Sequence, residues 1–216
     1  MPNRVLYGYW RSSAAYRVRI ALNLKGLEYQ QRSVHLVKAG GEQHSSAFRQ
    51  LNPNQLVPVF VDDEVTLNQS LTIIDYLDET YPEVLLTPSD KEQRYLVKAL
   101  AQDIAIDIHP LNNLRVLQYL SNQLKVEDSE KTRWYLHWVE CGFEALEQRL
   151  SQTHGQYCVG DHVTLADVCL VPQVYNARRF NLDMSRYPII EKVTASLNRL
   201  DAFQVASPDS QPDTEH

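Results

Sequence analysis

The sequence predicts a protein of two parts, an α/β unit over about the first eighty residues and an all-helical unit after it. In the first part, short runs with an apolar period of two alternate with stretches of helical period. A proline-bearing segment then precedes a region that is helical throughout. With 216 residues and 44% hydrophobic content, the chain can bury a substantial core. We expect domains at 1–83 and 91–206, a linker at 84–90 and a flexible polar tail at 207–216.

The elements of the first part follow from local signals. Gly26 is expected to end the first helix, and Pro82 to end the last one. Pro58 stands where a strand begins, a place where the missing N–H is tolerated and where a cis bond after Val57 would turn the backbone. Strands are predicted at 5–9, within 27–36, and at 56–61 and 65–67 as a hairpin, and helices at 13–25, 45–51 and 71–81.

The second part is predicted to be four long helices. They span 91–120, 129–152, 165–178 and 189–200. Pro110 lacks a backbone N–H and should kink or split the first of them. Thr164 and Asp167 match a capping box, in which the Thr hydroxyl caps the N–H of residue 167 and the carboxylate reaches back to the N–H of Thr164. The helix that begins there is expected at the centre of the domain.

Charge and composition exclude several classes of protein. A net charge of -6 argues against a nucleic-acid binder, because phosphate binding needs a basic face. No apolar run approaches the roughly 18 residues of a membrane span, and the first residues lack the apolar stretch of a signal peptide. The widely spaced Cys141, Cys158 and Cys169 are typical of buried, reduced thiols, and histidine spacing predicts no metal site. We therefore expect a cytoplasmic protein without a metal.

Two hydroxyls at the start of the first helix are the most informative feature of the chain. Ser12 and Ser13 directly follow the first strand. A helix start carries free N–H groups and about half a positive charge, so it can bind an anion. Spacing alone is equally consistent with two ordinary N-cap residues.

The chain carries a set of motifs that occur together: Ser12-Ser13 followed by 16–22, Val57-Pro58, Gln69-Ser70, the capping box and 176–180. Together these motifs resemble the zeta class of the glutathione transferase superfamily. The resemblance covers essentially residues 4–213. It implies a thioredoxin-like N-terminal domain, an all-helical C-terminal domain, a homodimer and glutathione as cofactor. Ala14 and Tyr16 stand where the class usually has cysteine and often tryptophan.

The resemblance implies that the anion is the thiolate of glutathione. A free thiol has a pKa of about 8.5, and lowering that pKa by about two units needs roughly 2.7 kcal/mol of anion stabilisation. A hydroxyl hydrogen bond and a helix N-terminus supply energy of that order. Ser12 is the first candidate for this catalytic bond and Ser13 the second. The other implied glutathione contacts are Ser70 and Gln69 for the γ-glutamyl carboxylate, the Val57 backbone for the cysteinyl part, Gln55 and His35 for the glycine end, and His109 and Asn113 from the second domain.

The implied reaction is the cis–trans isomerisation of maleylacetoacetate to fumarylacetoacetate in tyrosine and phenylalanine breakdown. Reversible addition of the thiolate makes the double bond single, so that it can rotate. The substrate carboxylates need positive charge, for which Arg11, Arg179 and, more weakly, Arg115 are candidates. Maleylpyruvate isomerisation is the alternative, followed by transferase or dehalogenase activity on small α-halo acids. A non-enzymatic glutathione-binding scaffold has no need of a thiolate-stabilising hydroxyl.

Overall fold

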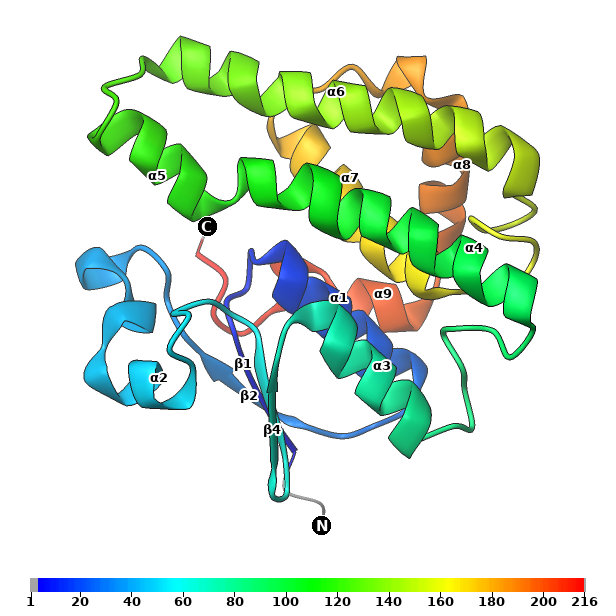
Figure 1. Cartoon of the computed structure of the whole chain (residues 1–216), viewed down its shortest axis with the longest axis horizontal. Coiled ribbons are helices and arrows are strands. Elements are labelled where there is room, and N and C mark those ends of the chain that lie inside the picture. The colour runs from blue at the N-terminus through cyan, green and yellow to red at the C-terminus, as the bar shows by residue number, and fades with distance from the viewer. Residues whose placement is uncertain (1–3, 216) are drawn as a thin grey trace. The chain divides into compact units, whose positions relative to one another are not determined.

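The computed structural model describes residues 4–215, and the chain forms two compact units (Figure 1). One unit comprises Met1–Leu86 with Arg199–His216, and the other Thr87–Asn198. An α/β part followed by a helical part is confirmed. The boundaries differ from the predicted ones, because the chain after residue 198 packs with the α/β unit rather than with the helices before it.

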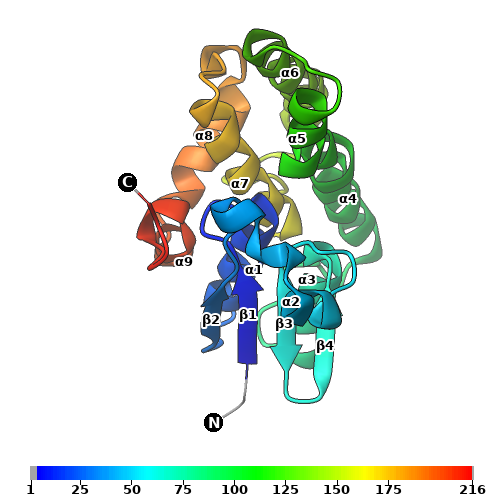
Figure 2. The same ribbon diagram turned by 90° about the vertical axis from the view of Figure 1, so that its left-hand side faces the viewer.

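The first unit is built on a four-stranded sheet of order β2-β1-β3-β4. Parallel pairing joins β1 and β2, and antiparallel pairing joins β1 to β3 and β3 to β4. Helices α1 and α3 lie on one face of the sheet and α2 on the other (Figures 1 and 2). The elements are β1 (Arg4–Gly8), α1 (Ser13–Leu24), β2 (Gln30–Ser33), α2 (Ser46–Leu51), β3 (Val59–Asp62), β4 (Val65–Asn68) and α3 (Ser70–Thr80).

The strand register brings three connections to one edge of the sheet. Tyr7, near the end of β1, pairs with Val59 at the start of β3, and Val59 pairs with Asn68 at the end of β4. The segments that follow β1, precede β3 and follow β4 therefore leave the sheet side by side, as Figure 2 shows for these strands. These segments contain the helix mouth, the Val-Pro pair and the Gln-Ser pair singled out in the sequence.

A short helix near the C-terminus, α9 (Asp201–Ala206), packs against α1. The buried guanidinium of Arg19 donates to the carbonyl oxygens of Ala206 and Trp10, both at 2.9 Å. Asn23 Nδ2 donates to the Ala202 oxygen at 3.1 Å. This helix was not predicted from the sequence. The chain leaves the preceding helix, α8 (Pro188–Leu197), and begins a new helix four residues later.

The segment after α9 differs from the predicted flexible tail. The Asp213 carboxylate accepts hydrogen bonds from the Ser33 hydroxyl at 2.6 Å and from the backbone N–H of Trp10 at 3.2 Å. It also accepts from Gln31 Nε2 at 3.3 Å. The Asp213 carboxylate thus joins β2 to the loop that leads into α1, and its hydrogen bonds anchor the polar C-terminal segment to the first unit.

The second unit is helical. Helix α7 lies at its core, with Val168, Leu170 and Val174 fully buried, and the capping box of Thr164 and Asp167 is confirmed. Its other helices are α4 (Lys91–Gln102), α5 (Leu114–Asn122), α6 (Asp128–Thr153) and α8 (Pro188–Leu197), and α7 spans Leu165–Arg179.

The break between α4 and α5 begins earlier than Pro110. The chain leaves α-helical geometry after Gln102, through a π-helical turn at Asp103–Ile108 and a 3-10 turn at His109–Asn112. The N–H of His109 bonds to the carbonyl of Ile104, five residues back. Pro110 has no N–H to offer to the preceding turn, so the helix widens before it reaches the proline.

Three further features bear on the expected class of protein. Within residues 4–215, no helix is long and apolar enough to cross a membrane. The same part of the chain contains no group of three or more His, Cys, Asp or Glu side chains arranged to hold a metal ion. All three cysteines are free, and Cys158 and Cys169 are buried. Cys141 is exposed instead, because it lies on the outer face of α6.

Candidate active site

Ser12 forms the N-cap of α1. Its backbone is extended, with φ -72° and ψ 116°, and its Oγ accepts the N–H of Ala15 at 3.2 Å. A hydroxyl that accepts one hydrogen bond keeps its own proton to donate. Ser12 is partly exposed, whereas Ser13, in the first turn of the helix, is buried. The N-cap and anion-binding interpretations of Ser12 are therefore compatible, and the exposure of its side chain favours it over Ser13.

The segment that leads to the Val-Pro pair is organised by Asn52, whose side chain is buried. Its Nδ2 donates to the Leu56 oxygen at 2.8 Å, and its Oδ1 accepts from Asn68 Nδ2 at 3.1 Å. The Val57–Pro58 bond is cis, as predicted. Asn52 thereby joins the segment before β3 to the end of β4. No role was predicted for Asn52, which directly follows the helix expected at 45–51.

The start of α3 provides a second helix mouth at the same edge of the sheet. Gln69 has a φ of 71°, and its side chain makes no capping bond to the helix. Ser70, the first residue of α3, is buried, and its Oγ accepts from Arg17 Nη1 at 3.3 Å. The N–H groups of the first turn have no acceptor within the helix, so this terminus favours an anion.

Two residues predicted for the glycine end have other contacts. Gln55 Oε1 lies 2.7 Å from His44 Nδ1 and has a backbone φ of 56°. His35 Nδ1 accepts the N–H groups of Val37 and Lys38, at 3.2 and 2.8 Å, and the ring is buried. His35 therefore shapes its own loop. Gln55 lies in the segment before the cis-proline.

Arg11 lies in the same loop as Ser12, with its guanidinium carbon 5.0 Å from the centre of the Trp10 ring. It is partly exposed. Stacking on an aromatic ring orients a guanidinium without using its donors, which leaves them for a carboxylate.

Chain neighbours of the predicted residues in the second unit, Asn112 and Phe180, contact Tyr135 of α6. Its carbonyl oxygen accepts from Asn112 Nδ2 at 3.0 Å, and its ring stacks on Phe180 with 3.6 Å between centroids. The Arg179 guanidinium carbon lies 5.2 Å from the Phe180 ring centre. Burial raises the pKa of Tyr135 to about 12, an effect that the Arg179 charge opposes. Arg179 and the turn that carries His109 therefore lie at one end of this unit.

The other predicted residues around this turn differ in exposure. Asn113 is the N-cap of α5, and its Oδ1 accepts the N–H of Arg115 at 3.1 Å. His109 is partly buried, and Arg115 is exposed. Arg179 donates to Asn176 Oδ1 at 2.7 Å, whereas the neighbouring Arg178 forms a surface ion pair with Glu191 at 2.8 Å. Arg178 is thus held at the surface by an acidic side chain.

The structure thus brings the candidates together in two groups. The first group lies at one edge of the sheet in the first unit and consists of Arg11, Ser12, Ser13, Gln55, Val57, Gln69 and Ser70. The second group lies at one end of the helical unit and consists of His109, Asn113, Arg115 and Arg179.

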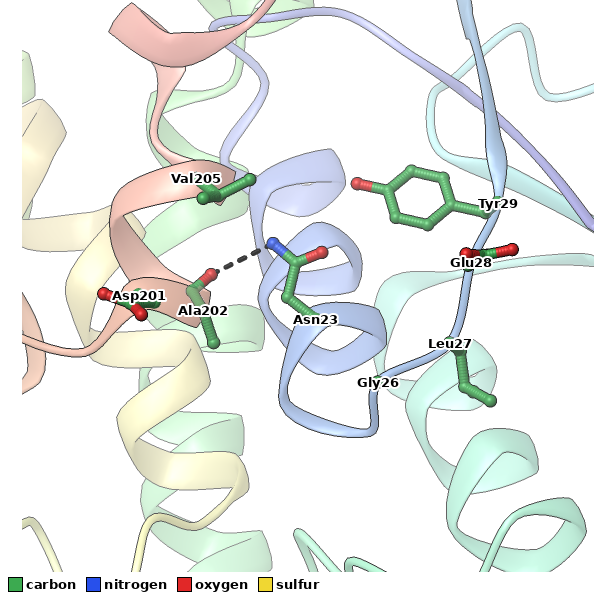
Figure 3. A pocket seen from close by; sticks show the side chains of 8 residues that line it. All are labelled: Asn23, Gly26, Leu27, Glu28, Tyr29, Asp201, Ala202 and Val205. Atoms are coloured by element: carbon green, nitrogen blue, oxygen red, sulfur yellow. Dashed lines mark hydrogen bonds between the residues drawn. The ribbon is translucent and has the colours of Figure 1, made fainter.

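A pocket of about 680 Å³ lies away from the first group, at the C-terminal end of α1 (Figure 3). Residues of α1, α9 and the segment before β2 line it, and the Asn23–Ala202 hydrogen bond joins two of these lining residues. Glu28 and Asp201 add negative charge, and the eight residues drawn include no lysine or arginine. The pocket does not suit an anionic ligand, and we do not assign the active site to it.

The architecture and the first group define a class of protein. A β1-α1-β2 unit whose helix is capped by Ser12, a cis-proline at the start of β3 and an all-helical unit built around a capped α7 are the parts of a glutathione S-transferase. The model of the glutathione S-transferase N-terminal domain matches residues 6–85, and that of the C-terminal domain matches residues 139–201. The chain belongs to the glutathione S-transferase family.

Individual relatives narrow the comparison to zeta-class isomerases. The chain is 61% identical to a probable maleylacetoacetate isomerase of Vibrio cholerae, over 99% of both chains. It is 45% identical to a maleylpyruvate isomerase of Ralstonia, over 97% of this chain and 99% of the relative. A maleylacetoacetate isomerase structure from Methylobacterium extorquens, with bound malonate and glutathione, is 37% identical and covers 98% of this chain and 100% of its own, with a TM-score of 0.94.

Proposed function

We propose that the protein is a glutathione-dependent cis–trans isomerase that converts maleylacetoacetate to fumarylacetoacetate. The observation that carries the proposal is Ser12, a partly exposed hydroxyl at the mouth of α1 in a segment without any cysteine. Cys158 and Cys169 are buried, and Cys141 lies on α6. The thiolate suited to this helix mouth is therefore a borrowed one. The 61% identity to a probable maleylacetoacetate isomerase supports the choice of reaction.

The residues at the sheet edge fit glutathione. Ser70 and the open N–H groups of α3 suit the carboxylate of the γ-glutamyl group, with Gln69 beside them. The Val57 backbone precedes the cis-proline, where an extended peptide can pair with it, and Gln55 lies in the same segment. His109 and Asn113 remain proposed contacts from the helical unit. The bound malonate and glutathione in the Methylobacterium extorquens relative support an anionic ligand together with this cofactor.

The chain's own residues supply the stabilisation of charge. When bound, glutathione supplies a thiolate that adds reversibly to the substrate double bond, so that the bond can rotate as a single bond. The hydroxyl of Ser12 donates a hydrogen bond to the thiolate sulfur, and the α1 terminus adds its partial positive charge. Arg11 and Arg179 bind the substrate carboxylates, with Arg115 as a third, more exposed candidate. Ser13 is the alternative donor.

Maleylpyruvate is the second candidate substrate, which the 45% identity to the Ralstonia maleylpyruvate isomerase favours. The deciding experiment follows isomerisation of maleylacetone, as the stable analogue of maleylacetoacetate, and of maleylpyruvate, each with and without glutathione. We expect turnover only with glutathione and a higher kcat/KM for maleylacetone. A higher kcat/KM for maleylpyruvate would make maleylpyruvate, rather than maleylacetoacetate, the preferred substrate. A parallel assay offers a small α-halo acid with glutathione. Turnover of that substrate alone would replace isomerisation by dehalogenation, and no turnover of any of the three would leave a binding scaffold.

We also propose a homodimer that acts in the cytoplasm, in tyrosine and phenylalanine breakdown. The family to which the chain belongs supports the dimer. Light scattering should give a mass near twice the 24.9 kDa of the chain. A monomer mass would refute the dimer, and recovery of the protein in a membrane or exported fraction would refute the location.

A further inference from the structure

Helix α1 carries two fully buried arginines with different surroundings. Arg17 is 2% exposed and Arg19 is 1% exposed. Burial of a guanidinium is costly unless its donors are bonded. The donors of Arg19 go to the backbone oxygens of Tyr9, Trp10 and Ala206, which ties α1 to the β1 loop and to α9. Arg19 thus has a structural explanation in its own neighbourhood.

Arg17 instead contacts a side chain of the candidate active site. Its Nη1 donates to the Oγ of Ser70 at 3.3 Å, across 53 residues of sequence. A guanidinium has no acceptor, so Ser70 must be the acceptor in this bond. One lone pair of Ser70 Oγ is therefore turned toward Arg17, and the hydroxyl proton is turned away from it.

The position of Ser70 determines which acceptor its hydroxyl proton can reach. Ser70 is the first residue of α3, and the preceding Gln69 turns the chain into the helix with a φ of 71°. The first N–H groups of α3 attract an anion, and a hydroxyl proton directed outward adds a further donor. If no fixed donor occupied a lone pair of Ser70 Oγ, the hydroxyl would rotate freely and would spend part of its time presenting a lone pair to that anion instead of its proton.

We propose that Arg17 is a positioning residue, which orients the Ser70 hydroxyl to donate to the α-carboxylate of the γ-glutamyl group. The inference rests on the proposed glutathione site. Through Ser70, the buried Arg17 of α1 would make the start of α3 selective for ligands that carry a carboxylate there. Arg17 acts through Ser70 and does not itself touch the ligand.

The test compares two ligands that differ in this carboxylate alone. Glutathione has it, and γ-aminobutyryl-cysteinylglycine lacks it. Calorimetry on the full chain gives the Kd of both ligands for the wild type, Arg17→Met, Ser70→Ala, the double variant and Arg19→Met. Arg19→Met is the matched control, because it removes an equally buried guanidinium from the same helix.

We expect Arg17→Met to weaken glutathione binding by about tenfold, the effect of one lost hydrogen bond to a charged group. Its affinity for the analogue should stay within about twofold of the wild type. Adding Arg17→Met to Ser70→Ala should change the glutathione Kd little, since the hydroxyl is already absent. Arg19→Met should lower the melting temperature and keep the wild-type preference for glutathione.

Two results would overturn the inference. One is a wild-type ratio of the two Kd values in Arg17→Met, and the other is an additive effect of Arg17→Met and Ser70→Ala on the glutathione Kd. If Arg17→Met does not fold, Arg17→Lys replaces it. Its shorter side chain keeps the charge but falls short of Ser70, so a wild-type ratio there is equally contrary. A wild type that fails to bind glutathione refutes the proposed function, whereas loss of preference in Ser70→Ala alone refutes only the role of Arg17.

Discussion

Replacing Ser12 by alanine removes two interactions of different size. The first is the cap to the N–H of Ala15, whose loss costs about 1 kcal/mol of unfolding free energy. The second is the proposed bond to the thiolate, worth roughly 1.5–3 kcal/mol because one partner is charged. The second loss raises the pKa of the bound thiol by about one to two units from about 6.5, so the thiolate fraction, and with it kcat/KM at pH 7, falls by about 3- to 25-fold. Activity should recover at higher pH, where the thiol ionises without help.

Companion variants separate the cap from the hydroxyl. Ser12→Gly keeps most of the capping stability, with a loss of a few tenths of a kcal/mol, but has no hydroxyl. Ser12→Thr keeps both functions. We expect Ser12→Gly to be nearly as stable as the wild type in urea and nearly as inactive as Ser12→Ala, and Ser13→Ala to retain activity. Wild-type kcat/KM in Ser12→Gly would refute the reasoning and move the role to Ser13 or to the backbone.

The remaining predictions concern other parts of the chain. Arg179→Ala should raise KM for the dicarboxylate substrate about tenfold or more, while Arg178→Ala, which breaks only a surface ion pair, should leave steady-state kinetics unchanged; equal effects would remove the assignment. Asp213→Asn should lower the free energy of unfolding, measured in urea, by about 1 kcal/mol and should speed hydrogen exchange at the Trp10 amide. Unchanged exchange at Trp10 would mean that the segment containing Asp213 is not anchored there. Tyr135 has a pKa raised by burial, so its neutral form favours the folded state, and folding stability is lost as pH rises above the unfolded pKa of about 10. Between pH 9 and 11 the wild type should lose about 1.3 kcal/mol more unfolding free energy than Tyr135→Phe, and parallel curves would contradict this.

Features that depend on neighbouring residues could be predicted from the sequence. Ser12 caps the N–H of Ala15, three residues ahead, and Thr164 and Asp167 form a reciprocal capping box. The residues that start these two helices are therefore close together in the sequence and can be recognised there. Gly26 has a φ of 64° directly after α1, as expected of a glycine that ends a helix.

Features that depend on distant contacts could not be predicted. Helix α9 has only six residues and is held by Arg19 and Asn23, about 180 positions away, so local propensity carries little signal for it. The same holds for Asp213, whose polar surroundings in the sequence are typical of a mobile tail. In the site, Ser70 could be named from its place before a helix, whereas its bond to Arg17 follows from packing between α1 and α3.

Stabilisation of a thiolate at the mouth of α1 is tested most directly by titrating the thiol of glutathione while it is bound to the protein. The ultraviolet absorbance of the thiolate, followed against pH for the saturated wild type, gives that pKa. We predict a value about two units below that of the free thiol, which corresponds to roughly 2.7 kcal/mol of preferential anion stabilisation. A bound pKa equal to that of free glutathione would contradict the role of the helix mouth and of Ser12.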